Sequence, residues 1–200
     1  MIIRCEKEEC DGRCNPNMFY MTSEILGEGG LIVYPTETLY GIGGDATRPE
    51  ISIEINRLKG AKEDKPISVA YSSVEHISEY VDLPPKALEL ARRFLPGPLT
   101  MVVDTPQGNI GIRVPDHPLA AGIIKNFGPI TSTSVNIHGM DPVDDIDSAL
   151  SLFGNKIQLY IDCGKSRMKT GTTVVKVNDK IEILREGAIG RDEILGKELH

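Results

Sequence analysis

The alternation of apolar and polar positions along the chain predicts a mixed set of strands and helices. Short continuous or alternating apolar runs predict strands over residues 31–34, 67–71, 99–103, 110–114, 130–135, 157–162, 172–177 and 181–185. Apolar residues recurring every three or four positions predict helices over residues 17–28, 49–59 and 84–95. Capping residues predict short helices over residues 73–80 and 147–153, with Ser72 or Ser73 as the cap of the first, and composition predicts one over residues 118–127. Strands and helices alternate early and strands pair locally later, which predicts an α/β domain with a mixed sheet.

Turn and cap residues mark the borders of these elements. Asp147 is the predicted N-cap of the helix that runs to Phe153. The sequence PQGN at residues 106–109 predicts a hairpin turn between two strands, and a second hairpin is expected across Asn178 and Asp179. A short helix or tail is expected from Ile189 onward.

The first 16 residues differ in character from the rest of the chain. They are charged and cysteine-rich, so we interpret residues 1–16 as an extension and residues 17–200 as one domain. The four cysteines are Cys5, Cys10, Cys14 and Cys163. The spacing of the first three is not a common zinc pattern, and we favour reduced thiols on a mobile terminus. A metal knuckle completed by Cys163 is the alternative.

Composition narrows the range of functions. The chain has 200 residues and a net charge of -7, which does not favour nucleic acid as a direct partner. It has no apolar run long enough to span a membrane and no apolar signal core, so we expect a cytoplasmic protein. Neither a G-x-x-x-x-G-K-[ST] loop nor a G-x-S-x-G elbow is present, which argues against P-loop and α/β-hydrolase chemistry.

The segment LIVYPTETLYGIGG at residues 31–44 is the first candidate site. Pro35 ends a predicted strand, because proline cannot donate to a sheet, and Thr36, Glu37 and Thr38 follow. Ligands of open α/β sheets bind beyond the carboxyl ends of strands. A polar turn that caps its own backbone explains the same residues equally well.

Two further candidates are cationic. The end of the predicted helix 49–59 and the loop after it place Arg57, Lys59, Lys62 and Lys65 within nine residues, which suits a polyphosphate. The alternative is a solvated helix end with cations against the helix dipole. Arg113 lies in an apolar strand, where a charge is costly unless paired, so it binds a ligand carboxylate, pairs with an acidic side chain of the protein, or lies on an exposed face.

Hydroxyl groups form the remaining candidates. Residues 131–134 are four consecutive serines and threonines followed by asparagine, which could hold phosphate or ribose oxygens or could face water on an edge strand. Residues 169–173, KTGTT, are followed at a distance by Arg185, which ends a strand and could reach a phosphate.

Eight segments together, in this order, resemble the YrdC-type threonylcarbamoyl-AMP synthase family. The resemblance spans about residues 29–189, and its segments are PTETLYGIG (35–43), KGAKEDKPISV (59–69), FLPGPLTMVV (94–103), GIRVPDHP (111–118), STSVN (132–136), DCGKS (162–166), GTTVV (171–175) and ILREGAI (183–189).

The resemblance implies a fold and a reaction. The fold would be a YrdC-like twisted mixed sheet with flanking helices around a positively charged cavity. The reaction would join L-threonine, bicarbonate or CO2, and ATP, with Mg²⁺, into threonylcarbamoyl-adenylate and pyrophosphate. The product would pass to a tRNA threonylcarbamoyl transferase complex, which makes threonylcarbamoyladenosine in tRNA.

The resemblance also implies residue roles, in which positioning and charge neutralisation carry the catalysis. The catalytic residues would be Lys59, Lys62 and Arg113. The threonine-binding residues would be Thr36, Arg113, Ser132 and Thr172. The ATP-binding residues would be Lys59, Lys62, Asn109, Ser134, Pro142 and Arg185, and no metal would be held by protein ligands alone.

The chain departs from the family pattern at a few positions. Many relatives have K-G-R-P where this chain has Lys59-Gly60-Ala61-Lys62, so Lys62 is the substitute candidate for the second phosphate cation. Ala70 stands where a histidine is common. Two rival functions remain, namely an RNA-binding or ribosome-associated module of the same fold and carbamoyl transfer as in hydrogenase maturation proteins.

Overall fold

The computed structural model describes residues 1–6, 10, 15–106, 108–166, 168 and 170–196. Ten strands in this part of the chain form one twisted sheet with the order β1-β8-β2-β3-β7-β4-β6-β5-β9-β10. The strands are β1 (Ile2–Arg4), β2 (Ile32–Tyr34), β3 (Gly41–Gly43), β4 (Ser68–Ala70), β5 (Leu99–Thr105), β6 (Gly108–Arg113), β7 (Ile130–Ser134), β8 (Leu159–Asp162), β9 (Thr173–Val177) and β10 (Ile181–Arg185).

The sheet is mixed, as predicted. β8 runs parallel to both β1 and β2, and the pairs β4/β6 and β5/β9 are also parallel. The remaining neighbours are antiparallel, including the two predicted hairpins β5/β6 and β9/β10. β7 pairs with β3 through Thr133 and Ser134 and with β4 through residues 130–132, so it joins the two halves of the sheet.

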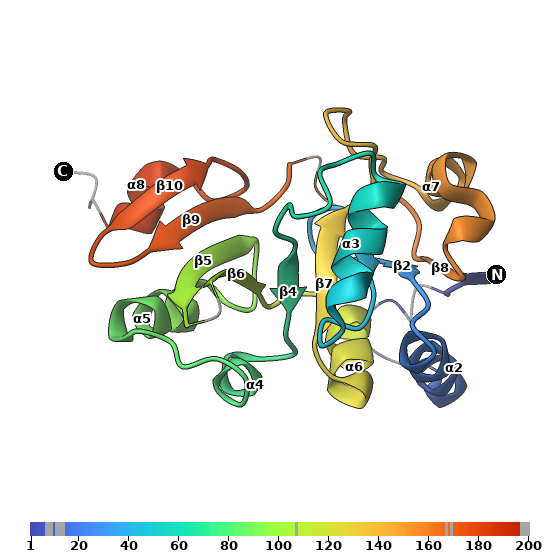
Figure 1. Cartoon of the computed structure of the whole chain (residues 1–200), viewed down its shortest axis with the longest axis horizontal. Helices are drawn as coiled ribbons and strands as arrows, with labels where there is room; N and C mark the ends of the chain where they lie inside the picture. The colour runs from blue at the N-terminus through green and yellow to red at the C-terminus, as the bar shows by residue number, and fades with distance from the viewer. Residues whose placement is uncertain (7–9, 11–14, 107, 167, 169, 197–200) are drawn as a thin grey trace.

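Helices flank this sheet, with α3 over its middle and α7 and α8 towards opposite ends of the molecule (Figure 1). The helices are α2 (Pro16–Gly27), α3 (Pro49–Leu58), α4 (Val74–Ser78), α5 (Pro85–Phe94), α6 (Pro118–Phe127), α7 (Ile146–Phe153), the 3-10 turn η1 (Gly154–Lys156) and α8 (Arg191–Leu195). Proline at the first turn of four of them fits a position whose N–H needs no intrahelical partner. The predicted cap of α7 was wrong by two residues, because Asp145, and not Asp147, accepts from the backbone N–H of Ser148.

The alternation of side chains along β2 divides the first half of the core into two layers. Ile32 and Tyr34 pack with α2 and α6 on one face, whereas Val33 packs with α3 and α7 on the other. A third cluster fills the space between the β5/β6/β9 region and α4, α5 and α8. In that half the apolar side chains of β5 and β6, such as Met101 and Ile112, face these helices. The opposite face of these strands does not contribute to this cluster and is available for other contacts.

Three strands differ from the sequence-based expectation. β1 and β3 were not predicted, and β1 places part of the predicted N-terminal extension at the edge of the sheet, beside β8. β7 is a central strand, so its hydroxyl groups do not lie on a water-exposed edge, and Thr131 is 1% exposed.

The cysteines also differ from expectation. Cys10 and Cys163 form a disulfide with a Cα–Cα distance of 5.9 Å, which corrects the preference for reduced thiols. Two side chains that meet across 153 positions of sequence could not be paired from spacing alone. Cys14 lies outside the described residues. Among the described residues, no helix is long and apolar enough to cross a membrane.

Candidate active site

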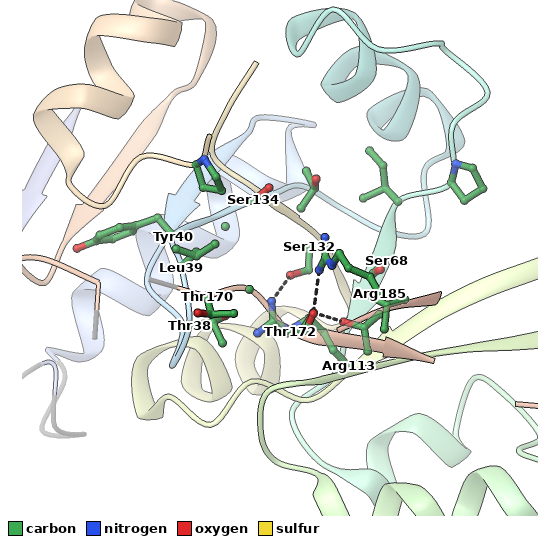
Figure 2. Close-up of a pocket in the computed structure, with 18 of the residues that line it drawn as sticks. Thr38, Leu39, Tyr40, Ser68, Arg113, Ser132, Ser134, Thr170, Thr172 and Arg185 are labelled. Carbon is green, nitrogen blue, oxygen red and sulfur yellow. Dashed lines mark hydrogen bonds between the residues drawn. The ribbon is translucent and has the colours of Figure 1, made fainter. Parts of the chain in front are cut away.

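The face of the second half-sheet that is turned away from α4, α5 and α8 forms the wall of a cavity of about 430 Å³. This volume suits a small organic ligand. Polar and small residues alternate with the core residues there, and Thr100 follows Leu99 in β5 while Arg113 follows Ile112 in β6. Figure 2 shows Arg113, Ser132, Thr172 and Arg185 gathered in one part of this cavity.

Arg113 is a buried cation on the cavity wall, with 9% of its side chain exposed. Its Nη2 atom lies 2.9 Å from Oε1 of Glu37, and its Nη1 atom donates to Oγ of Ser132 at 3.3 Å. Its Nε atom is buried and has no hydrogen-bond partner among the described residues. A buried donor of this kind carries a desolvation cost until a partner accepts from it, so this arginine can take a ligand carboxylate in addition to Glu37.

Glu37 has a definite place in this arrangement. Its second carboxylate oxygen accepts from the backbone N–H of Asp116 at 3.1 Å, while the first binds Arg113. The carboxylate therefore ties the loop after β2 to the loop after β6. Because the Glu37 side chain is only 11% exposed, it holds the guanidinium in one orientation and offsets its charge.

Hydroxyl groups cover the wall on both sides of Arg113. Ser132 accepts a hydrogen bond from Oη of the buried Tyr34 at 2.9 Å. Thr172 shares a hydrogen bond of 2.8 Å with Thr100, and Nη2 of Arg185 donates to the carbonyl oxygen of Thr172 at 3.0 Å. These contacts fix the side chains of Ser132, Thr172 and Arg185 on the cavity wall before any ligand binds.

Lys59 lies behind the part of the wall that Ser134 forms. It is 6% exposed, and its Nζ atom donates to the carbonyl oxygen of Ser134 and, at 3.2 Å, to Oδ1 of Asn136. Burial, and then the nearby charge of Lys65, lower the pKa of Lys59 to about 8. Its ammonium group is therefore only partly protonated at mildly alkaline pH.

The structure brings together six of the predicted site residues as lining of the cavity. These are Arg113, Ser132, Ser134, Pro142, Thr172 and Arg185. Lys59 is next to them but does not line the cavity.

Three other predicted residues lie apart from that wall. Thr36 is buried, donates to the carbonyl oxygen of Leu39 at 2.6 Å, and lines a smaller cavity of about 50 Å³. Lys62 and Asn109 are exposed, on the loop after α3 and on β6. The roles assigned to these three residues stay predictions.

Glycines 41 and 43 serve a packing purpose that the sequence did not reveal. Tyr34 pairs with Gly41 across β2 and β3, and a Cβ atom on Gly43 would lie 2.9 Å from Cε1 of the Tyr34 ring. The two glycines therefore leave room for this ring, which in turn holds Ser132 on the cavity wall. Both glycines therefore serve close packing, and Gly41 also lines the cavity.

Several residues of the site were not singled out from sequence. Tyr34 and Thr100 support the predicted residues Ser132 and Thr172 through hydroxyl contacts. Tyr40 lines both cavities and donates to the carbonyl oxygen of Gly164 at 2.6 Å. Tyr34 and Tyr40 lie within the first candidate segment, residues 31–44, and Thr100 is the polar residue of an otherwise apolar strand.

Acidic side chains offset part of the positive charge at the cavity. Arg113 and Arg185 line it, but Glu186 lines it as well and Glu37 neutralises Arg113. The net positive charge expected for this cavity therefore stays a prediction.

Comparison with known proteins gives consistent results. A putative threonylcarbamoyl-AMP synthase of Mycobacterium tuberculosis is 33% identical over 178 residues, covering 83% of this chain and 82% of that protein. One of Methanocaldococcus jannaschii is 32% identical over 182 residues, covering 85% of each. The crystal structure of P. abyssi Sua5 complexed with L-threonine superposes with a TM-score of 0.84 at 27% identity, covering 98% of this chain and 61% of the other.

A family model also matches most of the chain. Residues 24–187 match the model named Sua5_yciO_yrdC, with the description telomere recombination. The matched range includes all the strands from β2 to β10 and every residue that lines the cavity. The chain therefore belongs to the Sua5/YciO/YrdC family.

Proposed function

We propose that the chain is an L-threonylcarbamoyladenylate synthase. It joins L-threonine, bicarbonate or CO2, and ATP into threonylcarbamoyl-AMP and pyrophosphate, for the threonylcarbamoyladenosine modification of tRNA. The observation that carries the proposal is Arg113, a buried arginine with an unpartnered Nε on the wall of a cavity of ligand size. Relatives named threonylcarbamoyl-AMP synthase and a family structure in complex with L-threonine support it.

The threonine end of the site is assigned to Arg113 and its hydroxyl neighbours. Arg113 would bind the substrate carboxylate through Nε and a terminal nitrogen, in the side-by-side geometry that arginine favours. Ser132 and Thr172 would contact the substrate from the same part of the wall. Threonine would then present its amino nitrogen, as a carbamate formed with CO2, to the nucleotide.

The nucleotide end is assigned to Lys59, Ser134 and Arg185. In the reaction a carbamate oxygen attacks the α-phosphorus of ATP and pyrophosphate leaves. The protein contributes position and charge, since no side-chain nucleophile is needed. Arg185 and the ammonium group of Lys59 would offset the phosphate charge, and Ser134 would contact the nucleotide.

Mg²⁺ is expected to enter with ATP. This ion takes one or two carboxylates and completes its shell with phosphate oxygens and water. Glu186 supplies one carboxylate at the cavity wall beside Arg185, which fits that requirement. The ion would neutralise the charge of the departing pyrophosphate.

The remaining partners are also proposals. Bicarbonate would be the carbon source, and a tRNA threonylcarbamoyl transferase complex would accept the product. A labile mixed anhydride of this kind is suited to direct transfer from a cavity that limits contact with water.

The test is a product assay with ATP, L-threonine and labelled bicarbonate. We expect label in threonylcarbamoyl-AMP, together with ATP–pyrophosphate exchange that needs both threonine and bicarbonate. Exchange that proceeds equally well without threonine would contradict the assignment.

A further inference from the structure

Three cysteine side chains meet at one place beside the sheet, outside the site described above. The Sγ atoms of Cys5, Cys10 and Cys163 all lie within 4.8 Å of one another. Two of these residues form the disulfide, and Cys5 is the third. Because a disulfide needs only two sulfur atoms, it does not account for the proximity of the third, from Cys5.

The strand pairing of the fold creates this meeting point. β1 runs parallel to β8, with Arg4 opposite Asp162, and the backbone N–H of Cys5 donates to the carbonyl oxygen of Asp162 at 2.8 Å. Cys5 and Cys163 therefore leave the ends of neighbouring parallel strands. Cys10 is buried against them with 8% of its surface exposed. Regular backbone contacts, and not a flexible tail, thus place two of the three sulfurs.

We propose that Cys5, Cys10 and Cys163 form a thiolate site for a soft divalent cation of the Zn²⁺ class, and that the disulfide is the oxidised form of the same cluster. A Zn–S bond is about 2.3 Å, so the sulfurs of a tetrahedral site lie about 3.8 Å apart. Sulfurs within 4.8 Å need only small side-chain movements to reach that arrangement. These three ligands from the described residues leave one coordination position for water or another donor.

The interconversion of the two forms balances chemically. A dithiol reductant supplies two electrons and two protons to the Cys10–Cys163 disulfide and becomes a disulfide itself. The thiols that result lose their protons as they bind the cation, because only thiolates are ligands. Reduction therefore creates the metal site, and oxidation of the same sulfurs removes it.

The cluster adjoins the cavity wall through Tyr40. The Tyr40 hydroxyl accepts from the backbone N–H of Cys163 at 2.9 Å and donates to the carbonyl oxygen of Gly164 at 2.6 Å. Tyr40 lines the main cavity, and Cys10 and Cys163 line the smaller cavity beside Thr36. A cation held here would pin the chain after β8 to the chain after β1 and so fix the place of Tyr40.

The experiment uses the full chain, reduced under anaerobic conditions and titrated with Co²⁺ as a spectroscopic substitute for Zn²⁺. We expect one equivalent of Co²⁺ to bind with thiolate-to-metal charge-transfer absorption, and Zn²⁺ to displace it. The air-oxidised chain should bind about 100-fold more weakly, because its disulfide removes two ligands. Cys5→Ser should also weaken Co²⁺ binding about 100-fold, although it leaves both disulfide cysteines in place.

Met18→Leu is the matched control, since Sδ of Met18 lies 3.9 Å from Sγ of Cys5 and leucine keeps the volume of the side chain. This variant should bind Co²⁺ as the unmodified chain does. Far-ultraviolet circular dichroism would establish that each variant is folded. A reduced chain without charge-transfer absorption, or a folded Cys5→Ser variant that binds Co²⁺ as tightly as the unmodified chain, would overturn the proposal and leave a disulfide only.

Discussion

At the scale of single residues, the site is built from side chains whose partners are already in place. Glu37 and Ser132 hold the Arg113 guanidinium, Tyr34 holds Ser132, and Thr100 holds Thr172. Pre-organisation of this kind lowers the cost of binding, because little side-chain freedom remains to be lost. Lys59 has different partners, Ser134 and Asn136, so the roles of Arg113 and Lys59 can be separated by mutation.

Arg113→Ala is expected to weaken L-threonine binding by at least about 30-fold, since removing one partner of a buried charged pair costs about 2 kcal/mol or more. ATP binding should change by less than about threefold, because no phosphate contact is assigned to this residue. Isothermal titration calorimetry measures both ligands, which suits a chain without tryptophan.

Arg57→Ala is the control for this variant. Arg57 was part of the cationic candidate in the sequence, but it pairs with Glu63 at the surface, where its side chain is 65% exposed, and it does not line the cavity. It should leave both affinities unchanged. Equal losses for threonine and ATP in Arg113→Ala would show that the arginine is purely structural.

Lys59 gives an expected pH dependence. Its pKa of about 8 means that the ammonium group loses its proton as the pH rises through that value. ATP binding should therefore weaken between about pH 7 and about pH 9, because phosphate favours the charged form. Lys59→Arg should remove this dependence, since a guanidinium stays protonated throughout.

Calorimetric titration of ATP over this range, in both proteins, gives the comparison. An affinity that falls in parallel for the lysine and arginine forms would assign the pH effect to another group. Binding that strengthens with pH would contradict the role of the ammonium group.

At the scale of elements, regular patterns in the sequence predicted most helices and strands. The strands and contacts that the sequence did not predict depend on partners distant in the chain. α2 and α6 begin and end within one residue of their predicted limits because proline and glycine mark their ends. β1 and β3 are three residues long, too short for a periodic signal, and exist because β8 and β7 pair with them. Arg113 was predicted as a buried charge, but the choice of Glu37 as its partner depends on how two loops meet.

The close contact between β3 and Tyr34 yields a prediction about stability. Gly43→Ala would place a Cβ atom 2.9 Å from the Tyr34 ring and 3.2 Å from Cδ1 of Ile130. Because all three residues are buried, we expect a loss of about 1–3 kcal/mol in the free energy of unfolding. Urea denaturation followed by circular dichroism measures this loss.

Gly27→Ala provides the matched comparison. Gly27 is the last residue of α2, and a Cβ atom there meets nothing within 4 Å. This change should leave the stability unaltered or raise it by up to about 1 kcal/mol. If the two variants lost equal stability, the close approach to Tyr34 would not be the cause of the effect at Gly43.

At the scale of the whole molecule, charge argues against the rival reading of an RNA-binding module. With a net charge of -7, the chain should show no sequence-independent affinity for RNA in about 0.2 M salt, where phosphate contacts are weakened. A gel-shift assay with unmodified tRNA tests this expectation. Tight binding under these conditions would favour the RNA-binding alternative.

The order of strands in the sheet has a consequence for co-translational folding. β2 lies between β3 and β8, and β5 lies between β6 and β9, so each of these two strands needs a partner that is synthesised after β7. The cavity wall likewise extends from Thr38 to Glu186. A nascent chain that ends before β9 thus has only part of the binding site, and the wall is complete only after β9 and β10 have been synthesised.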